Sequence, residues 1–313
     1  MNPAPDLHVI VGAGPVGRAV IDELTTRDLP LRVVARQRPS DLPATVEFQA
    51  ADITDQDAAR GAMAGATIVY HAASAPYDRW PELLPPLMHG VIAGATAAGA
   101  RIVYADNLYA YGPVSGPLTE DLPAAAQGPN GRVRAELADL LLRADATGSV
   151  RATIGRASDY YGPRGRQSQA GERLFASVLA GKAAQLLGDP DMPHTYTHLA
   201  DFARGLVTLG THEASVGEVW HLPSAETLTS RAFVELVCKV AGEPPRLSVT
   251  PSWLLALLAT VNPTIRAVRE QRFQVERPWV VDHSRFARAF GVRVTPHPDA
   301  IRATLDWYAG SGG

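Results

Sequence analysis

Residues 7–17 decide the fold of this chain, and they read Leu-His-Val-Ile-Val-Gly-Ala-Gly-Pro-Val-Gly. A short apolar run leads directly into Gly12, Gly14 and Gly17, which have the spacing G-x-G-x-x-G. In this motif the first glycine permits a tight turn and the second lets a pyrophosphate approach the backbone. The third lets the following helix pack closely on its strand. The stretch therefore predicts a dinucleotide-binding turn that also contains Pro15 and Val16, with the amides of a helix start facing the phosphates.

The segments that follow repeat the same alternation of strand and helix. Strand-like runs occupy residues 7–11, 31–35, 46–50, 67–71, 101–105 and 150–154. Helical patterns lie between most of them, at residues 16–27, 56–64, 83–98 and 132–146. The order predicts an α/β fold of Rossmann type, with a doubly wound parallel sheet that binds its ligand beyond the carboxyl ends of the strands.

The alternation ends near residue 156, where proline and glycine become frequent. We expect a dinucleotide-binding domain over residues 1–156 and a smaller, mixed substrate region over residues 157–313. Residues 194–222 contain further strand and helix patterns and are expected to return in part to the first domain. The apolar run at 253–261 is interpreted as a core helix, with a lid over an apolar substrate as the alternative.

Composition sets limits on the partners of the protein. The 313 residues are 46% hydrophobic and 19% charged, with a net charge of −3, which gives no electrostatic case for nucleic acid or an anionic membrane. No apolar stretch approaches the ~20 residues that span a bilayer, and the start of the chain does not resemble a signal peptide. These features predict a cytoplasmic protein. The single cysteine, Cys238, lies in an apolar run and is expected to be a core residue.

Six short motifs give the chain a family resemblance. They read Gly-Ala-Gly-Pro-Val-Gly at 12–17, Ala-Asp-Ile at 51–53, His-Ala-Ala-Ser at 71–74, Tyr-Ala-Tyr-Gly-Pro at 109–113, Arg-Ala-Ser-Asp-Tyr-Tyr-Gly-Pro at 156–163 and His-Leu-Ala-Asp-Phe-Ala at 198–203. In this order they resemble the extended short-chain dehydrogenase/reductases, the NAD-dependent epimerase/dehydratase family. The resemblance implies a homodimer formed through helices 83–98 and 132–146.

The resemblance also implies positions for the cofactor. Asp52 would bond the adenine amino group and Ile53 would pack on the ring, although an acid at the start of a helix is an alternative interpretation of Asp52. His71, Ala72 and Ala73 would line the cofactor after the fourth strand.

The residues after the second strand indicate which cofactor is bound. Members of the family that bind NAD place an acid there for the ribose 2′-hydroxyl, whereas this chain has Arg36 and Arg38. Arginine would pair with a 2′-phosphate that a carboxylate would repel. The sequence therefore favours NADP(H) over NAD(H), unless the two arginines are only solvated surface residues.

The catalytic residues of the family are replaced in this chain. Asn130 stands at the position of the tyrosine in the family motif Tyr-x-x-x-Lys, and Arg134 stands at the position of the lysine. Asn107 stands where the family has serine or threonine. An amide can donate a hydrogen bond to an oxyanion, and arginine can keep the ribose contact but stays protonated.

Two interpretations of this departure are open. In the first, the protein is an NADPH-dependent reductase of a small organic substrate, in which Asn107 and Asn130 polarise the substrate and Tyr109 supplies the proton. In the second, it is a redox-silent NADP(H)-binding protein, or an enzyme of non-redox chemistry. Nucleotide-sugar epimerisation or dehydration ranks lower, because it normally needs the missing tyrosine.

The resemblance places the substrate beside a further group of side chains, namely Tyr111, Asp159, Tyr160, Tyr196 and His198. A structural role is the stronger interpretation of Tyr111. His194 and His198 lack a convincing third ligand, so no metal site is expected.

Overall fold

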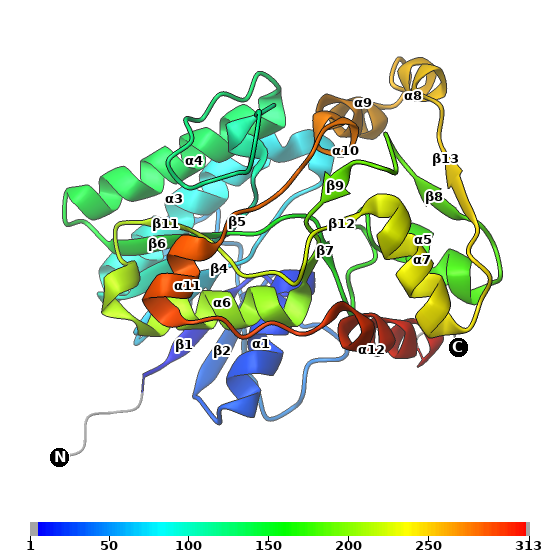
Figure 1. Cartoon of the computed structure of the whole chain (residues 1–313). Helices are drawn as coiled ribbons and strands as arrows, with labels where there is room; N and C mark the ends of the chain where they lie inside the picture. The colour runs from blue at the N-terminus through cyan, green and yellow to red at the C-terminus, as the bar shows by residue number, and fades with distance from the viewer. Residues whose placement is uncertain (1–5, 311–313) are drawn as a thin grey trace.

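The computed structural model describes residues 6–310, and a seven-stranded parallel sheet lies at its centre (Figure 1). The strand order is β11-β6-β5-β4-β1-β2-β3. The strands are β1 (His8–Val11), β2 (Leu31–Ala35), β3 (Glu47–Ala50), β4 (Ile68–His71), β5 (Arg101–Asp106), β6 (Arg151–Arg156) and β11 (Val219–His221). All six pairings are parallel, which confirms the predicted Rossmann-type sheet.

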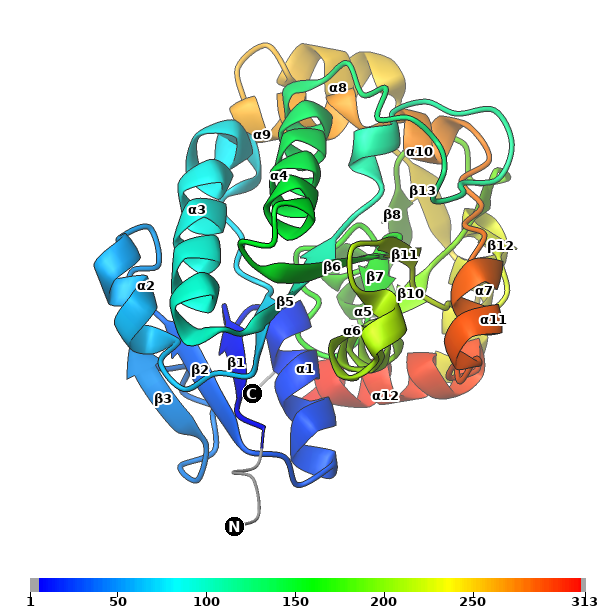
Figure 2. The ribbon, with the colours of Figure 1, turned by 90° about the vertical axis from the view of Figure 1, so that its left-hand side faces the viewer.

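Helices cover both faces of the sheet (Figure 2). One face packs against α2 (Gln56–Ala62), α3 (Trp80–Ala98) and α4 (Pro129–Ala146), and the other packs against α1 (Pro15–Thr26) and α6 (Leu199–Thr211). Successive side chains of a strand point to opposite faces. In β1, Val9 and Val11 accordingly join the first layer, while Ile10 joins the second.

Two helices begin earlier than the hydrophobic pattern predicts, and this places the site. α3 begins at Trp80 and α4 begins at Pro129, each with a proline in its first turn. Proline suits this position because the first amides of a helix have no partner within the helix. Asn130 and Arg134 therefore lie on the first turns of α4, at the carboxyl edge of the sheet.

The C-terminal half adds a second, smaller core. Its elements are β7 (Tyr160–Tyr161), α5 (Glu172–Leu179), β8 (Ala184–Leu186), β9 (Pro193–His194), β10 (Thr197–His198), β12 (Leu228–Thr229), α7 (Ser230–Ala241), β13 (Leu247–Val249), α8 (Ser252–Leu258), α9 (Pro263–Glu270), α10 (Phe273–Glu276), α11 (Ser284–Phe290) and α12 (His297–Gly310). Helices α5, α7 and α12 enclose this core, and Cys238 is buried in it. β11 pairs with β6 in the large sheet. The division near residue 156 stays a prediction.

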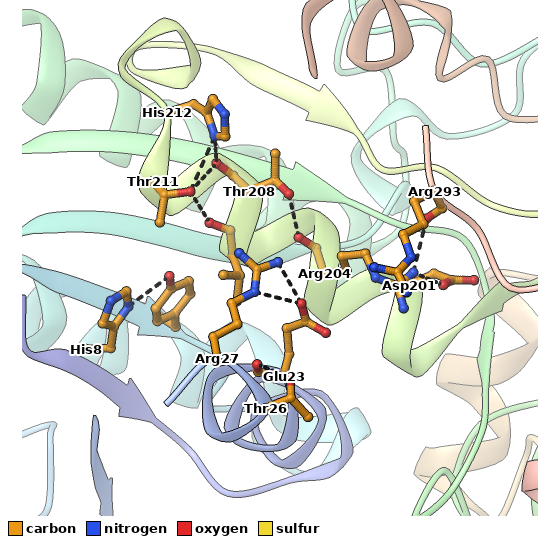
Figure 3. Close-up of polar contacts among 12 residues, drawn as sticks. His8, Glu23, Thr26, Arg27, Asp201, Arg204, Thr208, Thr211, His212 and Arg293 are labelled. Atoms are coloured by element: carbon orange, nitrogen blue, oxygen red, sulfur yellow. Dashed lines mark hydrogen bonds and ion pairs between the residues drawn. The ribbon is translucent and has the colours of Figure 1, made fainter. Parts of the chain in front are cut away.

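A buried acid joins the two halves at the start of α6. Asp201 Oδ1 accepts a hydrogen bond of 2.5 Å from Arg204, whose guanidinium also donates to the carbonyl of Arg293 at 3.1 Å (Figure 3). Asp201 Oδ2 accepts from the backbone amide of Thr295 at 2.9 Å. These bonds hold the segment that leads into α12 against the helix beside the sheet.

The prediction that residues 253–261 form a core helix is wrong. Helix α8 contains no buried residue, and the side chains of Trp253 and Leu257 are 67% and 60% exposed. The helix packs against α9 at the margin of the molecule, so its apolar side chains find no opposing layer (Figure 1). Within residues 6–310, no helix combines the length and the apolar character needed to cross a membrane.

Candidate active site and cofactor cleft

The glycine-rich turn between β1 and α1 is closed on two sides. Gly12 has a φ of +97°, and a Cβ there would lie 2.5 Å from the backbone of Ala73, at the end of β4. A Cβ on Gly17 would collide with the carbonyl oxygen of Gly12. Both positions therefore require glycine, because the backbone segments approach too closely for a side chain.

The same turn is open at its middle glycine. Gly14 is the N-cap of α1, and a Cβ there would meet nothing within 4 Å. Gly12 and Gly17 pack against neighbouring backbone, whereas Gly14 faces open space. The amides at the start of α1 are therefore free to bind an anion. The turn thus fits the pyrophosphate of a dinucleotide, with Pro15 and Val16 in the first turn of the helix.

The residues after β2 and β3 surround the expected adenosine position. Arg36 is exposed, whereas Arg38 donates to the carbonyl of Pro43 at 2.8 Å and covers the ring of Phe48 at 5.5 Å. Arg38 therefore helps to hold its own loop. Arg36 makes no hydrogen bond within residues 6–310 and is the freer cation.

Asp52 does not cap a helix, so that alternative is wrong. Its carboxylate accepts hydrogen bonds from the Thr54 hydroxyl at 2.7 Å and the Thr54 amide at 3.0 Å, and these bonds lower the pKa of Asp52. The cap of α2 is Asp55. Ile53 is buried next to α3.

His71 closes the end of β4. Its ring is buried and stacks on Tyr104, with 5.1 Å between ring centroids. Burial, with a smaller contribution from Arg134, lowers the pKa of His71 to about 3, so the imidazole is neutral at pH 7. Its Nδ1 is buried without a partner within residues 6–310.

Two arginines and one carboxylate form the centre of the site. Asp106 ends β5, and its Oδ2 accepts a hydrogen bond of 2.9 Å from Arg156 Nε. Arg134 donates to the Tyr104 hydroxyl at 2.7 Å and lies 3.4 Å from Asp106 Oδ1. The guanidinium of Arg134 also lies 4.2 Å above the ring of Trp80, a cation–π contact. The buried centre therefore carries one net positive charge.

The predicted catalytic side chains gather around this centre. Tyr109 stacks on Trp80 at 5.9 Å, on the ring that also carries Arg134. Asn107 accepts a hydrogen bond of 3.0 Å from the Tyr109 amide through Oδ1, and Asn130 donates from Nδ2 to the Tyr77 carbonyl at 3.0 Å. The structure thus brings Asn107, Tyr109, Asn130 and Arg134 together at the carboxyl ends of β4 and β5.

Tyr109 differs from an activated tyrosine. Burial raises its pKa well above the usual value, and Tyr77 and Asp159 add to the shift. Its hydroxyl therefore remains protonated throughout the physiological range. A phenol in this state donates a hydrogen bond and gives its proton only to a strong base such as an alkoxide, and it is itself a poor base.

Two of the side chains expected to contact the substrate have hydroxyl groups that are already within hydrogen-bond distance of other protein side chains. Tyr111 is fully buried, and its hydroxyl donates to His221 Nε2 at 2.8 Å, because His221 Nδ1 donates to the carbonyl of Asp282. The Tyr196 hydroxyl lies 2.8 Å from Ser230 Oγ. We therefore assign both tyrosines to the walls of the site rather than to substrate contact.

The other three expected substrate residues lie in the region of β7, β9 and β10. Asp159 precedes β7 and lies 3.1 Å from His194 Nε2. Burial, followed by the charge of Asp159, raises the pKa of Tyr160. His198 packs on Tyr161 of the C-terminal core, with 5.4 Å between ring centroids. Within residues 6–310, no group of three or more potential metal ligands comes together.

Three residues of the centre were missed by the sequence analysis: Trp80, Tyr104 and Arg156. Arg156 opens one of the six motifs, so its charge at a strand end was available as a signal. Trp80 carried no signal, because it meets Arg134 only through the packing of α3 against α4.

The fold and the site together define a dinucleotide-binding protein, and comparison with known proteins names its class. Residues 8–222 match the NAD dependent epimerase/dehydratase family, and the chain belongs to this family. Similar curated proteins include a dTDP-glucose 4,6-dehydratase of Streptomyces griseus, 26% identical over 83% of this chain and 77% of that protein. A dTDP-6-deoxy-L-talose 4-dehydrogenase (NAD(P)(+)) of Kitasatospora kifunensis is 25% identical over 78% of this chain and 81% of that protein.

Solved structures agree with this assignment at the level of the fold. The UDP-glucuronic acid 4-epimerase of Bacillus cereus, solved in complex with NAD, superposes with a TM-score of 0.78. It is 17% identical and covers 98% of this chain and 100% of that one. The family is thus one of NAD-dependent enzymes, and the predicted resemblance is confirmed.

Proposed function

We propose that the protein is an NADP(H)-dependent reductase that converts a carbonyl of a small polar substrate into a hydroxyl. The observation that carries the proposal is the position of Tyr109, which stacks on Trp80 at 5.9 Å, on the ring that also carries Arg134, and whose backbone amide donates to Asn107. The bound cofactor would supply the hydride. Carbonyl reduction then requires the protein to supply only a hydrogen-bond donor and a proton.

The side chains divide these tasks by their chemistry. The Nδ2 group of Asn107 makes no hydrogen bond within residues 6–310 and would polarise the carbonyl oxygen. Tyr109 would give its proton to the alkoxide oxygen that forms. Arg134, held by Tyr104, Asp106 and Trp80, would bind the nicotinamide ribose from a fixed position. Arg36 would pair with the 2′-phosphate that distinguishes NADP(H).

Nucleotide-linked sugars are the first substrate class to test. The curated relatives are named for such substrates, and one of them is a 4-dehydrogenase. A half-open cavity of about 370 Å³ lies between β13, α8 and α10, with Arg269 and Arg272 in its wall. Arg272 pairs with Glu276 of the same wall at 3.3 Å, so Arg269 is the guanidinium that would suit a nucleotide phosphate, and the volume falls in the range of small-molecule sites.

Epimerisation or dehydration of a nucleotide sugar is the competing function, and the names of the relatives favour it. Both reactions begin when a base removes a hydroxyl proton. The raised pKa of Tyr109 leaves no phenolate to act as that base, and Asn130 stands in place of the family tyrosine that normally removes the proton. A homodimer through α3 and α4 remains part of the proposal, by family resemblance.

The test is NADPH oxidation, followed by loss of absorbance of the reduced nicotinamide, with a panel of nucleotide-linked keto sugars, aldehydes, ketones, imines and enones. We expect turnover with a keto substrate and a fall of roughly 10²-fold or more for Tyr109→Phe. Tyr308→Phe is the matched control, because Tyr308 lies on α12 in the C-terminal core. Full turnover in both Tyr109→Phe and Asn107→Ala would refute the assignment. NADPH binding without any turnover would favour the redox-silent alternative.

A further inference from the structure

Apolar side chains gather on the surface at and around helix α8. Among the large apolar side chains within residues 6–310, seven are exposed to solvent, and five of these lie between residues 249 and 261. We call these five residues the α8 patch: Val249, Trp253, Leu257, Leu258 and Val261. Val261, just beyond the helix, is 80% exposed. A cluster of exposed apolar side chains is typical of a surface that contacts another molecule or a lipid phase.

The fold holds this patch outward in a fixed way. Trp253 and Leu257 are one helical turn apart and therefore lie on the same side of α8. Leu255 faces elsewhere, because it lines the cavity between β13, α8 and α10. Arg266 of α9 donates to the carbonyl oxygens of Ala259 and Thr260 at 3.1 and 3.4 Å. These bonds tie the end of α8 to α9, so the two helices project together at the margin of the molecule (Figure 1).

The charges beside the patch have one sign. Between Glu243 and Glu270 the sequence contains no aspartate or glutamate, but it contains Arg246, Arg266 and Arg269. All three arginines are exposed. The net charge of −3 of the whole chain therefore conceals a local positive excess around the α8 patch.

Charge and shape together indicate what this surface contacts. A two-fold contact of the patch with a second copy of itself would bring arginines against arginines. A peptide helix binds in a groove, whereas α8 projects from the molecule (Figure 1). Tryptophan and aliphatic side chains next to arginine are typical of helices that lie in the interface of an anionic bilayer.

We propose that the α8 patch docks the protein on an anionic membrane surface. Trp253, Leu257 and Val261 enter the headgroup layer of the bilayer, and Arg246 and Arg266 approach lipid phosphates. Such a contact is peripheral and needs no membrane-spanning helix. Membrane docking does not depend on the reductase function proposed above.

Docking through α8 has a consequence for the candidate active site. Helix α9 contacts the 3-10 turn η1 (Tyr77–Arg79), and the ring of Tyr77 packs on Trp80 with 4.8 Å between centroids. Trp80 in turn carries Arg134 of the site. The docked protein therefore holds its active site close to the bilayer.

The first test is flotation of the full chain with vesicles made of equal parts phosphatidylglycerol and phosphatidylcholine. We expect binding that is roughly tenfold or more weaker on pure phosphatidylcholine and that falls at high salt, because the arginines act through the surface charge. Val261→Asp should weaken binding to the anionic vesicles roughly tenfold or more, since it places a carboxylate in the interface. Val292→Asp is the matched control, because Val292 is an exposed valine outside the patch. Absence of binding to the anionic vesicles, equal binding to neutral ones or equal losses in the two variants would overturn the proposal.

The second test is tryptophan fluorescence, which reports insertion directly. We expect the emission of the native protein to shift to shorter wavelength on the anionic vesicles. Trp253→Phe should lose this shift while it still binds, because phenylalanine keeps the apolar contact. A shift that persists in Trp253→Phe would show that α8 is not the inserted element and would overturn the proposal.

Sedimentation of the protein without vesicles tests the competing occupant, a second copy of the chain. We expect Val261→Asp to leave the oligomeric state unchanged. A dimer that Val261→Asp dissociates, in a protein that does not bind the anionic vesicles, would overturn membrane docking and assign the patch to self-association.

Discussion

Arg134 is the side chain on which most of the site depends. It is buried, and it contacts Tyr104, Asp106 and Trp80 from the second turn of α4. We expect Arg134→Met to lower the free energy of unfolding by about 2 kcal/mol, because it removes a charged hydrogen bond to Tyr104 and a cation–π contact with Trp80. Urea unfolding measures this loss.

Arg143→Met is the matched control on the same helix. Arg143 is exposed and pairs with Asp139 one turn away, so its loss should change the free energy of unfolding by less than ~1 kcal/mol. Equal losses in the two variants would show that the buried cluster does not stabilise the fold. The Arg134 variant should also bind NADPH more weakly than the control.

The spacing of the family motif was sufficient to place Asn130 and Arg134, but not to describe what surrounds them. Asn107 and Tyr109 could be predicted because they are close in sequence to the end of a strand. Trp80 and Gln274 meet the site only through tertiary packing, from helices remote in sequence. The hydroxyls of Tyr111 and Tyr196 have His221 and Ser230 as their hydrogen-bond partners, and these partners are also distant in the sequence.

Two glycines in the turn between β1 and α1 allow effects on stability and effects on cofactor binding to be measured separately. Gly12→Ala should destabilise the protein by about 2–3 kcal/mol, because a Cβ would meet the Ala73 backbone at a positive φ. Gly14→Ala should leave the unfolding midpoint unchanged, because its Cβ meets nothing, yet it should weaken NADPH binding. Thermal unfolding and a nicotinamide fluorescence titration measure the two effects. Unchanged binding in Gly14→Ala would place the pyrophosphate elsewhere.

Helix α8 shows where an apolar pattern alone misleads. Trp253 is 67% exposed, whereas Trp279 is 1% exposed and packs with Phe273. We expect Trp253→Ala to change the free energy of unfolding by less than ~0.5 kcal/mol, and Trp279→Ala to cost about 3–5 kcal/mol. Urea unfolding of both variants decides the point. A large loss in Trp253→Ala would mean that α8 is packed in solution.

The strands of the first half could be predicted closely because most of them are short apolar runs between turn residues; β3, which reads Glu-Phe-Gln-Ala, is the exception. The later elements could not, because β7, β9, β10 and β12 are two residues long and are defined by their partners rather than by their own pattern. A strand of two residues carries no periodicity to detect.

Buried histidines should make the stability of the protein depend on acid. Burial lowers the pKa of His71 to about 3 and that of His221 to about 4, from 6.5, and it also lowers the pKa of His8, His198 and His283. The unfolded chain binds more protons than the folded chain below pH 6.5. This contribution to stability is fully present above pH 6.5 and falls as the pH drops toward the folded values, by up to about 1.4 kcal/mol per pH unit each for His71 and His221.

Urea unfolding at pH 7, 6 and 5 measures this slope. Replacing His221 with Gln should reduce the slope between pH 6 and 5 by the equivalent of close to one bound proton. Stability that rises as the pH falls from 7 to 5 would contradict the burial of these side chains in their neutral form.

The central claim is a site that binds NADP(H) in preference to NAD(H), and its most direct test is a fluorescence titration of the purified protein with NADPH and NADH. We expect tighter binding of NADPH. Arg36→Ala should weaken NADPH binding roughly ten- to hundredfold and leave NADH binding unchanged, since one charge-assisted phosphate contact contributes about 1.5–3 kcal/mol. Equal affinity for the two cofactors, unaffected by Arg36→Ala, would contradict the NADP(H) assignment. Absence of binding to either cofactor would contradict the account as a whole.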